Sequence, residues 1–338
     1  MISLSSSMDL SALVDSATAF LGPVRLVTSQ DVILPYREHN ATTLRSCLQK
    51  LGTSHGSPII YLSSYPTHYT RTETLLARLR HMGYHVEEKI YPHRPLRVLR
   101  EALRLRGSKD PVLLGFRSHE LLPFVRLLLG RSTPIVFDAF VSVSDTLCDD
   151  RKSVPKIFTP ILRACDRWLS RLADATLVDT QAHAAFFRQE LGCTNAHVVY
   201  VECNEMLFRP IDVVPEQPPL ILWYGTDQPL HGVDRILRWA KSLEPLPVRF
   251  LLIGPIRKRH ASLLRSLALT NVEITDYVPY ESLSDIIARA TLCLGGPFGT
   301  SGKALRVIPG KVYQMLACDR PVLVADTPAI AELFGEKV

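Results

Sequence analysis

The sequence contains no long hydrophobic run, and its longest apolar stretches, such as 111–116 and 220–224, have only the length of strands. A helix that crosses a bilayer needs about 20 apolar residues, so none is expected. There is no low-complexity tract, and 46% of the 338 residues are hydrophobic, which favours a fully folded chain. The N-terminal stretch has no basic n-region and includes Asp9 and Asp15, so it is not expected to be a secretory signal.

The sequence also lacks the usual patterns of metal and disulfide sites. Its seven cysteines form neither a CxxC pair nor a zinc-binding spacing. Isolated cysteines of this kind are typical of reduced, buried thiols, which favours a cytoplasmic protein. No DxD-type acidic set follows a plausible strand, so we predict no metal site and no bound cofactor.

What the sequence does contain is two successive series of alternating strand and helix patterns. The first begins near residue 57 and ends with a strand expected at 198–201, and the second runs from 220–224 to 321–324. Strands and helices that alternate at this spacing indicate βαβ units. The expected fold is therefore α/β, with two Rossmann-like, doubly wound parallel-sheet domains. A cleft between them would receive ligands at the carboxyl ends of the strands.

Proline separates the two series. Residues 208–219 hold four prolines among charged residues, which is typical of a linker. The expected domains are therefore 57–210 and 211–338. Residues 1–56 fit neither series and are treated as an N-terminal extension of unknown role, with a helix expected at 10–21 and a hairpin or strand pair at 24–34.

Two glycine-containing loops follow strands of the second series. The first, 225–232, precedes a helix, so its backbone N–H groups and His231 offer donors to an anion, although such turns are also common as plain connections. The second, 295–303, has four glycines and leads to Lys303, Arg306 and Lys311. Three cations beside a helix N-terminus suit a pyrophosphate. This is not a P-loop, because alanine follows Lys303.

The run KALRVIPGKVYQMLACDRPVLVADTPAIAEL resembles the donor-binding motif of group-1-type, family-4-like retaining bacterial glycosyltransferases of the GT-B fold. The segments WYGTDQPLHGVDRIL, FLLIGP and NVEITDYVPYESLSDIIARATLCLG are similar to the elements that precede this motif, and the likeness spans about 58–338. VFDAFVSVSDTLCDDRK and ADATLVDTQAHAAFF resemble a branch concerned with cell-surface or secondary-metabolite glycans.

The resemblance implies a nucleoside-diphosphate sugar as co-substrate, with UDP as the expected carrier. The donor-binding residues that it implies lie at the phosphates, at the nucleobase and at the positively charged motif, namely Gly225, Thr226, Tyr277, Val278, Lys303, Arg306, Lys311 and Gln314. In the family a pair of glutamates, E-x7-E, holds the donor ribose. Here Gln314 replaces the second glutamate and Arg306 occupies the region of the first, which leaves the nucleotide's identity open.

On the acceptor side, the resemblance points to residues that follow strands of the first series. His119 is the candidate catalytic residue and Arg117 its neighbour, although a histidine at a helix start is often a cap or a surface residue. Asp145 and Asp149 lie in an expected polar loop and would orient an acceptor hydroxyl, or would simply form a turn.

The implied activity is metal-independent sugar transfer, with retention, to a glycan, a lipid-linked acceptor or a small molecule. Two alternatives stay open. One is another GT-B enzyme, such as an epimerase or a phosphorylase, and the other is a non-catalytic binding or scaffold protein derived from a transferase. The family normally adds a C-terminal helix that returns to the first domain. This sequence ends at Val338, through truncation or because the chain closes differently.

Positive charge gathers in one segment. The net charge is +6, yet six cations lie between residues 94 and 109. Three leucines and three arginines recur there at helical spacing: Leu96, Leu99, Leu103, Arg97, Arg100 and Arg104. This composition suits a helix on an anionic surface, so we expect peripheral contact with the inner face of a membrane and no nucleic-acid partner. The alternative is that the leucines pack the helix on the sheet.

Overall fold

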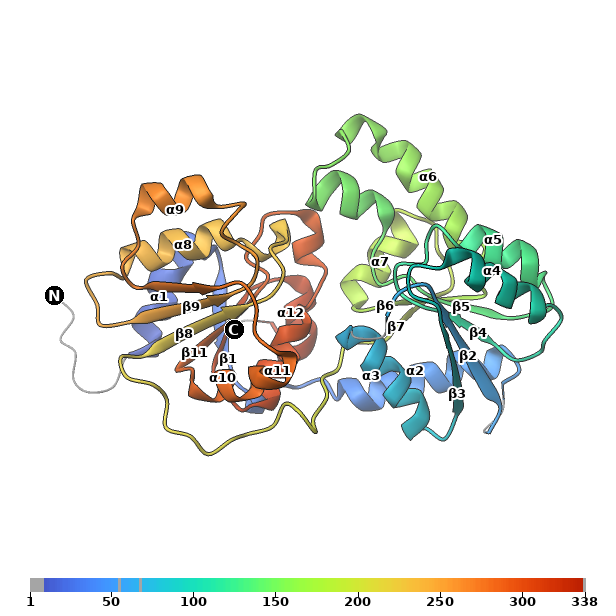
Figure 1. Cartoon of the computed structure of the whole chain (residues 1–338), viewed down its shortest axis with the longest axis horizontal. Helices are drawn as coiled ribbons and strands as arrows, with labels where there is room; N and C mark the ends of the chain where they lie inside the picture. The colour runs from blue at the N-terminus through green and yellow to red at the C-terminus, as the bar shows by residue number, and fades with distance from the viewer. Residues whose placement is uncertain (1–8, 54–55, 67–68, 337–338) are drawn as a thin grey trace. The chain divides into compact units, whose positions relative to one another are not determined.

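The computed structural model describes residues 9–53, 56–66 and 69–336, and its chain divides into two compact units (Figure 1). The central unit is Pro35–Glu202. The terminal unit combines Met1–Leu34 with Cys203–Val338. No helix in the described part of the chain is both long enough and apolar enough to cross a membrane.

The central unit is built on a six-stranded parallel sheet of order β3-β2-β4-β5-β6-β7. Its strands are β2 Pro58–Ser63, β3 His85–Ile90, β4 Val112–Leu114, β5 Ile135–Asp138, β6 Ala175–Val178 and β7 Ala196–Val198. Its helices are α2 Tyr36–Lys50, α3 Thr70–His81, α4 Pro95–Arg104, α5 Leu122–Leu129, α6 Thr159–Ser170 and α7 Gln181–Gln189. Helices α2 and α3 bury apolar side chains on one face of the sheet, and α4 and α5 lie on the other (Figure 1).

The terminal unit has a second six-stranded sheet, of order β1-β12-β11-β8-β9-β10. Its strands are β1 Val24–Val27, β8 Leu220–Tyr224, β9 Arg249–Ile253, β10 Val272–Thr275, β11 Leu292–Gly296 and β12 Val322–Ala325. Its helices are α1 Leu10–Leu21, α8 Val233–Ser242, α9 Ala261–Leu267, α10 Leu283–Arg289, α11 Gly310–Ala317 and α12 Pro328–Phe334. Every neighbouring pair is parallel except β1 with β12. The predicted pair of doubly wound α/β domains is therefore confirmed, with one antiparallel edge strand added.

Residues 1–56 are not an extension outside the two units, as far as the structure describes them. Strand β1 pairs with β12, and Trp239 Nε1 of α8 donates a hydrogen bond of 3.1 Å to Ser16 Oγ of α1. Helix α2 instead belongs to the central unit, where Asn40 Nδ2 donates to the carboxylate of Glu202 over 2.8 Å. The expected second strand of the 24–34 hairpin is absent, because Ser29–Asp31 forms a 3-10 turn.

The expected linker lies inside the terminal unit rather than at its border. The chain has no helix or strand between Val198 and Leu220, but Glu216 forms an ion pair of 3.0 Å with Arg289. The division of the chain accordingly falls after Leu34 and after Glu202 rather than at the expected positions 56 and 210. Long-range pairing, which local composition does not encode, sets these boundaries.

Each sheet has one point where the strand order reverses. In the central unit the chain adds β3 on one side of β2 and β4 on the other, and in the terminal unit β8 has β9 on one side and β11 on the other. Loops at the carboxyl ends of two such strands diverge to opposite faces and leave a crevice, which is where open α/β sheets bind ligands. The two glycine-containing loops of the sequence follow β8 and β11.

Candidate functional site

The loops after β8 and β11 pack directly on each other through glycines. Gly299 N donates a hydrogen bond of 2.8 Å to the carbonyl oxygen of Leu230. A Cβ on Gly299 would lie 2.4 Å from the carbonyl oxygen of Pro229, and one on Gly232 would lie 2.7 Å from the backbone of Phe298. Gly232 also has φ +61°, in the left-handed region. The glycines are therefore needed for close approach of the two loops at the switch point.

Lys311 brings a buried positive charge to this place. It is the second residue of α11, its side chain runs to the end of β8, and the residue is only 7% exposed. Its Nζ donates a hydrogen bond of 3.2 Å to the carbonyl oxygen of Tyr224 and lies 4.5 Å from the centre of a Trp223 ring. Among the described residues it forms no ion pair with a carboxylate. An ammonium group has three donors, so this one retains capacity for an anion.

Gly225 lies beside the ammonium group of Lys311, and Lys303 is a second buried lysine of the same unit. A Cβ on Gly225 would lie 3.7 Å from Lys311 Nζ, so the absence of a side chain leaves that side of the ammonium uncovered. Lys303, in the 3-10 turn Gly302–Leu305, is 8% exposed. Burial lowers the pKa of Lys311 well below its ordinary value, because an ammonium loses hydration there. The structure thus brings Gly225 and Lys311 together, as expected.

His231 occupies the same loop cluster as a neutral ring. Burial lowers its pKa well below the ordinary value, and the charges of Lys311 and Lys303 lower it further. Its Nδ1 is buried without a hydrogen-bond partner in the described part of the chain. Two lysines close enough to act on one imidazole indicate a locally positive site. The sequence predicted His231 only as an extra donor.

Gln314 is buried at 4% exposure and is held by two tyrosines. The hydroxyl of Tyr224 donates to Gln314 Oε1 over 2.8 Å, and Gln314 Nε2 donates to the hydroxyl of Tyr280 over 2.9 Å. Sequence reasoning missed both tyrosines. Tyr224 ends an otherwise apolar strand just before Gly225, which was an available signal, whereas Tyr280 is joined to Gln314 only by the fold.

We expect Gln314→Leu to lower the free energy of unfolding by roughly 1–3 kcal/mol, because the hydroxyl of Tyr224 would be buried without its acceptor. Gln314→Glu keeps an acceptor for that hydroxyl and should recover most of the loss. Urea denaturation of the three proteins measures this. A leucine variant as stable as the wild type would show that the amide does not hold Tyr224.

The remaining four predicted donor-binding residues lie on loops of the terminal unit. Thr226 is exposed, and Arg306 is half-buried at the end of the 3-10 turn that contains Lys303. Tyr277 and Val278 follow β10, the edge strand next to β9, and 78% of Tyr277 is exposed. The structure thus places these four residues on loops at the carboxyl edge of the sheet. It records no hydrogen bond or ion pair between the described side chains of Tyr277 and the two lysines.

In the central unit, Arg117 lies at the other switch point. It follows β4, has φ +67°, and its guanidinium carbon lies 5.1 Å from the ring centre of Tyr65, in the loop after β2. Phe116 stacks on Tyr69 of the same loop, with ring centres 4.9 Å apart. The Arg117 side chain itself is exposed. This edge therefore presents an aromatic and cationic surface.

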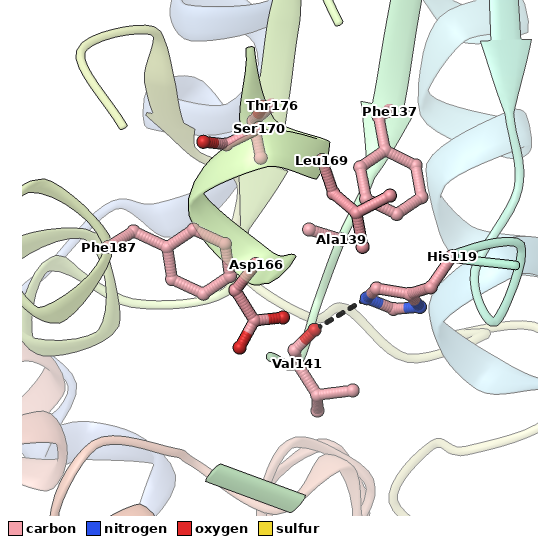
Figure 2. A pocket seen from close by; sticks show the side chains of 9 residues that line it. All are labelled: His119, Phe137, Ala139, Val141, Asp166, Leu169, Ser170, Thr176 and Phe187. Carbon is pink, nitrogen blue, oxygen red and sulfur yellow. Dashed lines mark hydrogen bonds between the residues drawn. The ribbon is translucent and has the colours of Figure 1, made fainter. Parts of the chain in front are cut away.

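His119 tethers two loops of the central unit. Its Nε2 lies 2.8 Å from the carbonyl oxygen of Val141, and because a carbonyl only accepts, Nε2 carries the proton (Figure 2). The ring packs edge-on against Phe137, with centres 5.0 Å apart. Burial lowers its pKa below the ordinary value, so the ring is neutral at pH 7 and Nδ1 is its acceptor atom.

Asp145 and Asp149 lie in a π-helical turn, Asp145–Asp150, where the sequence predicted a polar loop. Asp145 is buried and Asp149 half-buried. The turn is anchored by Asp166 of α6, which accepts hydrogen bonds from the backbone N–H groups of Val143 and Ser144 over 2.8 and 2.9 Å. The turn is therefore fixed by a contact with a segment that is distant in the sequence.

Asp166 also lines a small cavity beside His119 (Figure 2). The cavity has room for about one water molecule. Apolar side chains, among them Phe137, Leu169 and Phe187, form most of its wall. Burial raises the pKa of Asp166. A cavity of this size holds no sugar, so it belongs to the packing around His119.

A buried ion pair and a buried His–Asp hydrogen bond lie at the carboxyl ends of β5 and β6. Arg71 Nη2 lies 3.1 Å from Asp138 Oδ1, and His183 Nδ1 lies 2.7 Å from Asp179 Oδ1. Thr180 caps α7 by accepting a hydrogen bond from the backbone N–H of His183. His183 is fully buried, so it belongs to the core of the central unit.

No group of three or more His, Cys, Asp or Glu side chains that could hold a metal ion occurs in the described ranges.

No protein-family model matches the sequence, and no curated protein matches it significantly. Solved structures do resemble the chain. Sucrose-phosphate synthase from Thermosynechococcus elongatus superposes with a TM-score of 0.57 at 14% identity, over 79% of this chain and 80% of the synthase. The catalytic domain of starch synthase IV from Arabidopsis thaliana, bound to ADP and acarbose, gives 0.50 at 11% identity, over 71% and 78%. Both are GT-B glycosyltransferases. The chain therefore has the GT-B fold, with two parallel-sheet domains.

Proposed function

We propose that this protein transfers a sugar from a nucleoside-diphosphate sugar to an acceptor hydroxyl and that the terminal unit binds the donor. The observation that carries the proposal is the buried ammonium of Lys311 at the switch point, with one hydrogen bond to a carbonyl. A buried charge without a counter-ion is costly unless a ligand compensates it. A diphosphate supplies that compensation, and the N-terminus of α11 adds a favourable dipole.

The same arrangement explains how the reaction would proceed without a metal. Departure of the sugar leaves negative charge on the diphosphate, and preorganised cations stabilise this charge most in a water-poor site. Lys311 and Lys303, both nearly buried, are the groups offered for that role. The sequence resemblance favours retention at the anomeric carbon, a UDP-type carrier, and a glycan, lipid-linked or small-molecule acceptor, and the isolated cysteines favour a cytoplasmic protein.

On the acceptor side we propose the edge of the central unit formed by Arg117 and the aromatic rings of Tyr65 and Tyr69. Aromatic faces and a guanidinium group are suited to the apolar faces and the hydroxyl groups of a sugar. His119 has its protonated Nε2 committed to Val141. We therefore assign any acid–base role of His119 to Nδ1, as an acceptor.

Two measurements test the proposal. In the first, a panel of nucleoside diphosphates and nucleotide sugars is screened for thermal stabilisation, which a site-specific ligand produces by mass action. In the second, the best nucleotide sugar is incubated with and without EDTA, and release of the nucleoside diphosphate is followed. We expect stabilisation and slow release that EDTA does not abolish. Stabilisation by no nucleotide would overturn the donor site, and activity lost with EDTA and restored by Mg²⁺ would overturn metal independence.

A second candidate function is nucleotide-sugar binding without catalysis. It is favoured by Gln314, whose amide is held by Tyr224 and Tyr280 where the family has a ribose-binding carboxylate. The same experiment separates the two functions, because a pure binder is stabilised by the nucleotide sugar but releases no nucleoside diphosphate.

A further inference from the structure

Helix α4 turns two of its three leucines outward. Leu96 is 79% exposed and Leu103 is 51% exposed, whereas Val98 and Ala102 are fully buried. The interpretation that the leucines pack this helix on the sheet is therefore wrong for Leu96 and Leu103, whereas Leu99 is half-buried. On a helical wheel the leucine stripe lies beside the arginine stripe and roughly opposite the buried stripe. Both stripes face away from the sheet.

Helix α5 extends the same surface. It packs against α4, and it buries Leu122, Val125 and Leu129 while exposing Phe124 (56%) and Leu127 (75%). In Figure 1 the two helices lie side by side on one face of the central sheet. We call this surface the basic–apolar face, and its members are Leu96, Leu103, Phe124, Leu127, Arg94, Arg97 and Arg100. Four large apolar side chains gathered on two adjacent helices mark an interaction surface.

The positive charge of this face is not neutralised by the protein. The only carboxylate of α4, Glu101, is buried and pairs with Lys89 and Arg104 over 3.2 and 3.1 Å. Arg94, Arg97 and Arg100 are exposed and form no ion pair within the described ranges. Helix α5 carries no acidic residue. The face therefore combines apolar side chains with uncompensated cations.

We propose that the basic–apolar face docks the protein on an anionic lipid surface. Leucine and phenylalanine side chains enter the boundary between headgroups and acyl chains while arginines bind lipid phosphates. A second copy of the same face would bring like charges together, which is unfavourable. Nucleic acid would match the arginines but would leave the leucines and Phe124 in water. A lipid interface is the partner that accepts both kinds of side chain.

Co-sedimentation of the full chain with phosphatidylcholine vesicles, with and without phosphatidylglycerol, tests the docking. We expect binding to the anionic vesicles at low salt and release at high salt, because salt screens the headgroup attraction. Arg97→Gln with Arg100→Gln should weaken binding about 25-fold, since each cation contributes about fivefold. Leu96→Ser with Leu103→Ser should weaken it by about tenfold for each leucine.

The matched control is Arg238→Gln with Arg265→Gln, two exposed arginines on α8 and α9 of the terminal unit, which changes the net charge equally. All six residues substituted in these three double variants are exposed. Circular dichroism melting checks that each variant is folded. Failure to pellet at low salt, or an equal loss in the control, would overturn the docking. So would a lipid-free dimer that the leucine substitutions dissociate. Lys311→Met should bind vesicles as the wild type does. Failure of the lipid docking and failure of the proposed donor site can therefore be told apart.

Discussion

Replacing Lys311 with methionine should nearly abolish donor use while making the ligand-free protein more stable. Loss of a charge-assisted contact weakens nucleoside diphosphate binding by about 1.5–3 kcal/mol. Turnover should fall further, by about 10²–10³, because the charge on the leaving diphosphate is no longer stabilised. Calorimetry and nucleotide-release assays measure the two effects.

The gain in stability has a definite pH dependence. Burial lowers the pKa of Lys311 in the folded state below its unfolded value, so the unfolded chain binds the proton more tightly. The cost of the buried charge is fully present below the folded pKa and disappears as pH rises toward the unfolded value near 10.4. The stability advantage of Lys311→Met should therefore shrink as pH rises from neutral to alkaline.

Lys258→Met is the control for the loss of diphosphate binding and for the gain in stability. Lys258 is exposed on the connection after β9, so the same substitution there removes a charge without relieving burial. It should leave diphosphate affinity and stability close to those of the wild type. If Lys311→Met binds the diphosphate as tightly as Lys258→Met does, the site has been assigned to the wrong cation.

Gly299→Ala should destabilise the terminal unit by about 3 kcal/mol, at the upper end of overpacking effects. The added methyl group would lie 2.4 Å from the carbonyl oxygen of Pro229 and 2.7 Å from the Cα of Leu230. Both contacts are with backbone, which cannot rotate away as a side chain can. Relief requires the loops after β8 and β11 to separate, so we expect weaker diphosphate binding as well.

Tryptophan fluorescence in urea can follow the terminal unit alone. Of the three tryptophans, Trp223 and Trp239 are buried in that unit, and Trp168 is half-exposed in the central unit. A Trp168→Phe background therefore reports on the terminal unit. Thr300→Ala, an exposed neighbour, is the control and should change stability by less than about 0.5 kcal/mol. Equal midpoints for the two alanine variants would contradict the close packing of the loops.

Local sequence patterns were sufficient to predict most of the secondary structure of both sheets. The apolar run 220–224 is fully buried in β8, as parallel strands covered on both faces require. The glycines and lysines of the 295–303 loop and its neighbours were recognised from composition alone, because close backbone approach and positive charge each demand particular residue types. The proximity of Gly225 to Lys311 is a finding of the structure.

Tertiary structure decided the features that depend on contacts between distant segments. Strand β1 pairs with β12 across almost the whole chain, so the N-terminal residues belong to the terminal unit although they precede the central one. Gln314 belongs to α11, but its hydrogen-bond partners Tyr224 and Tyr280 come from two other elements.

In helix α4, the sequence predicted the periodicity, whereas the tertiary structure decided which face is buried. The periodicity of the sequence identified the leucine and arginine stripes of α4. Any of its faces could in principle pack on the sheet, and hydrophobicity alone favoured the leucine stripe. The sheet is instead covered by the smaller Val98 and Ala102, while Glu101 is retained by its pairing with Lys89. Which stripe is buried is settled only when α4 packs against α5 and the paired strands, which the local sequence does not describe.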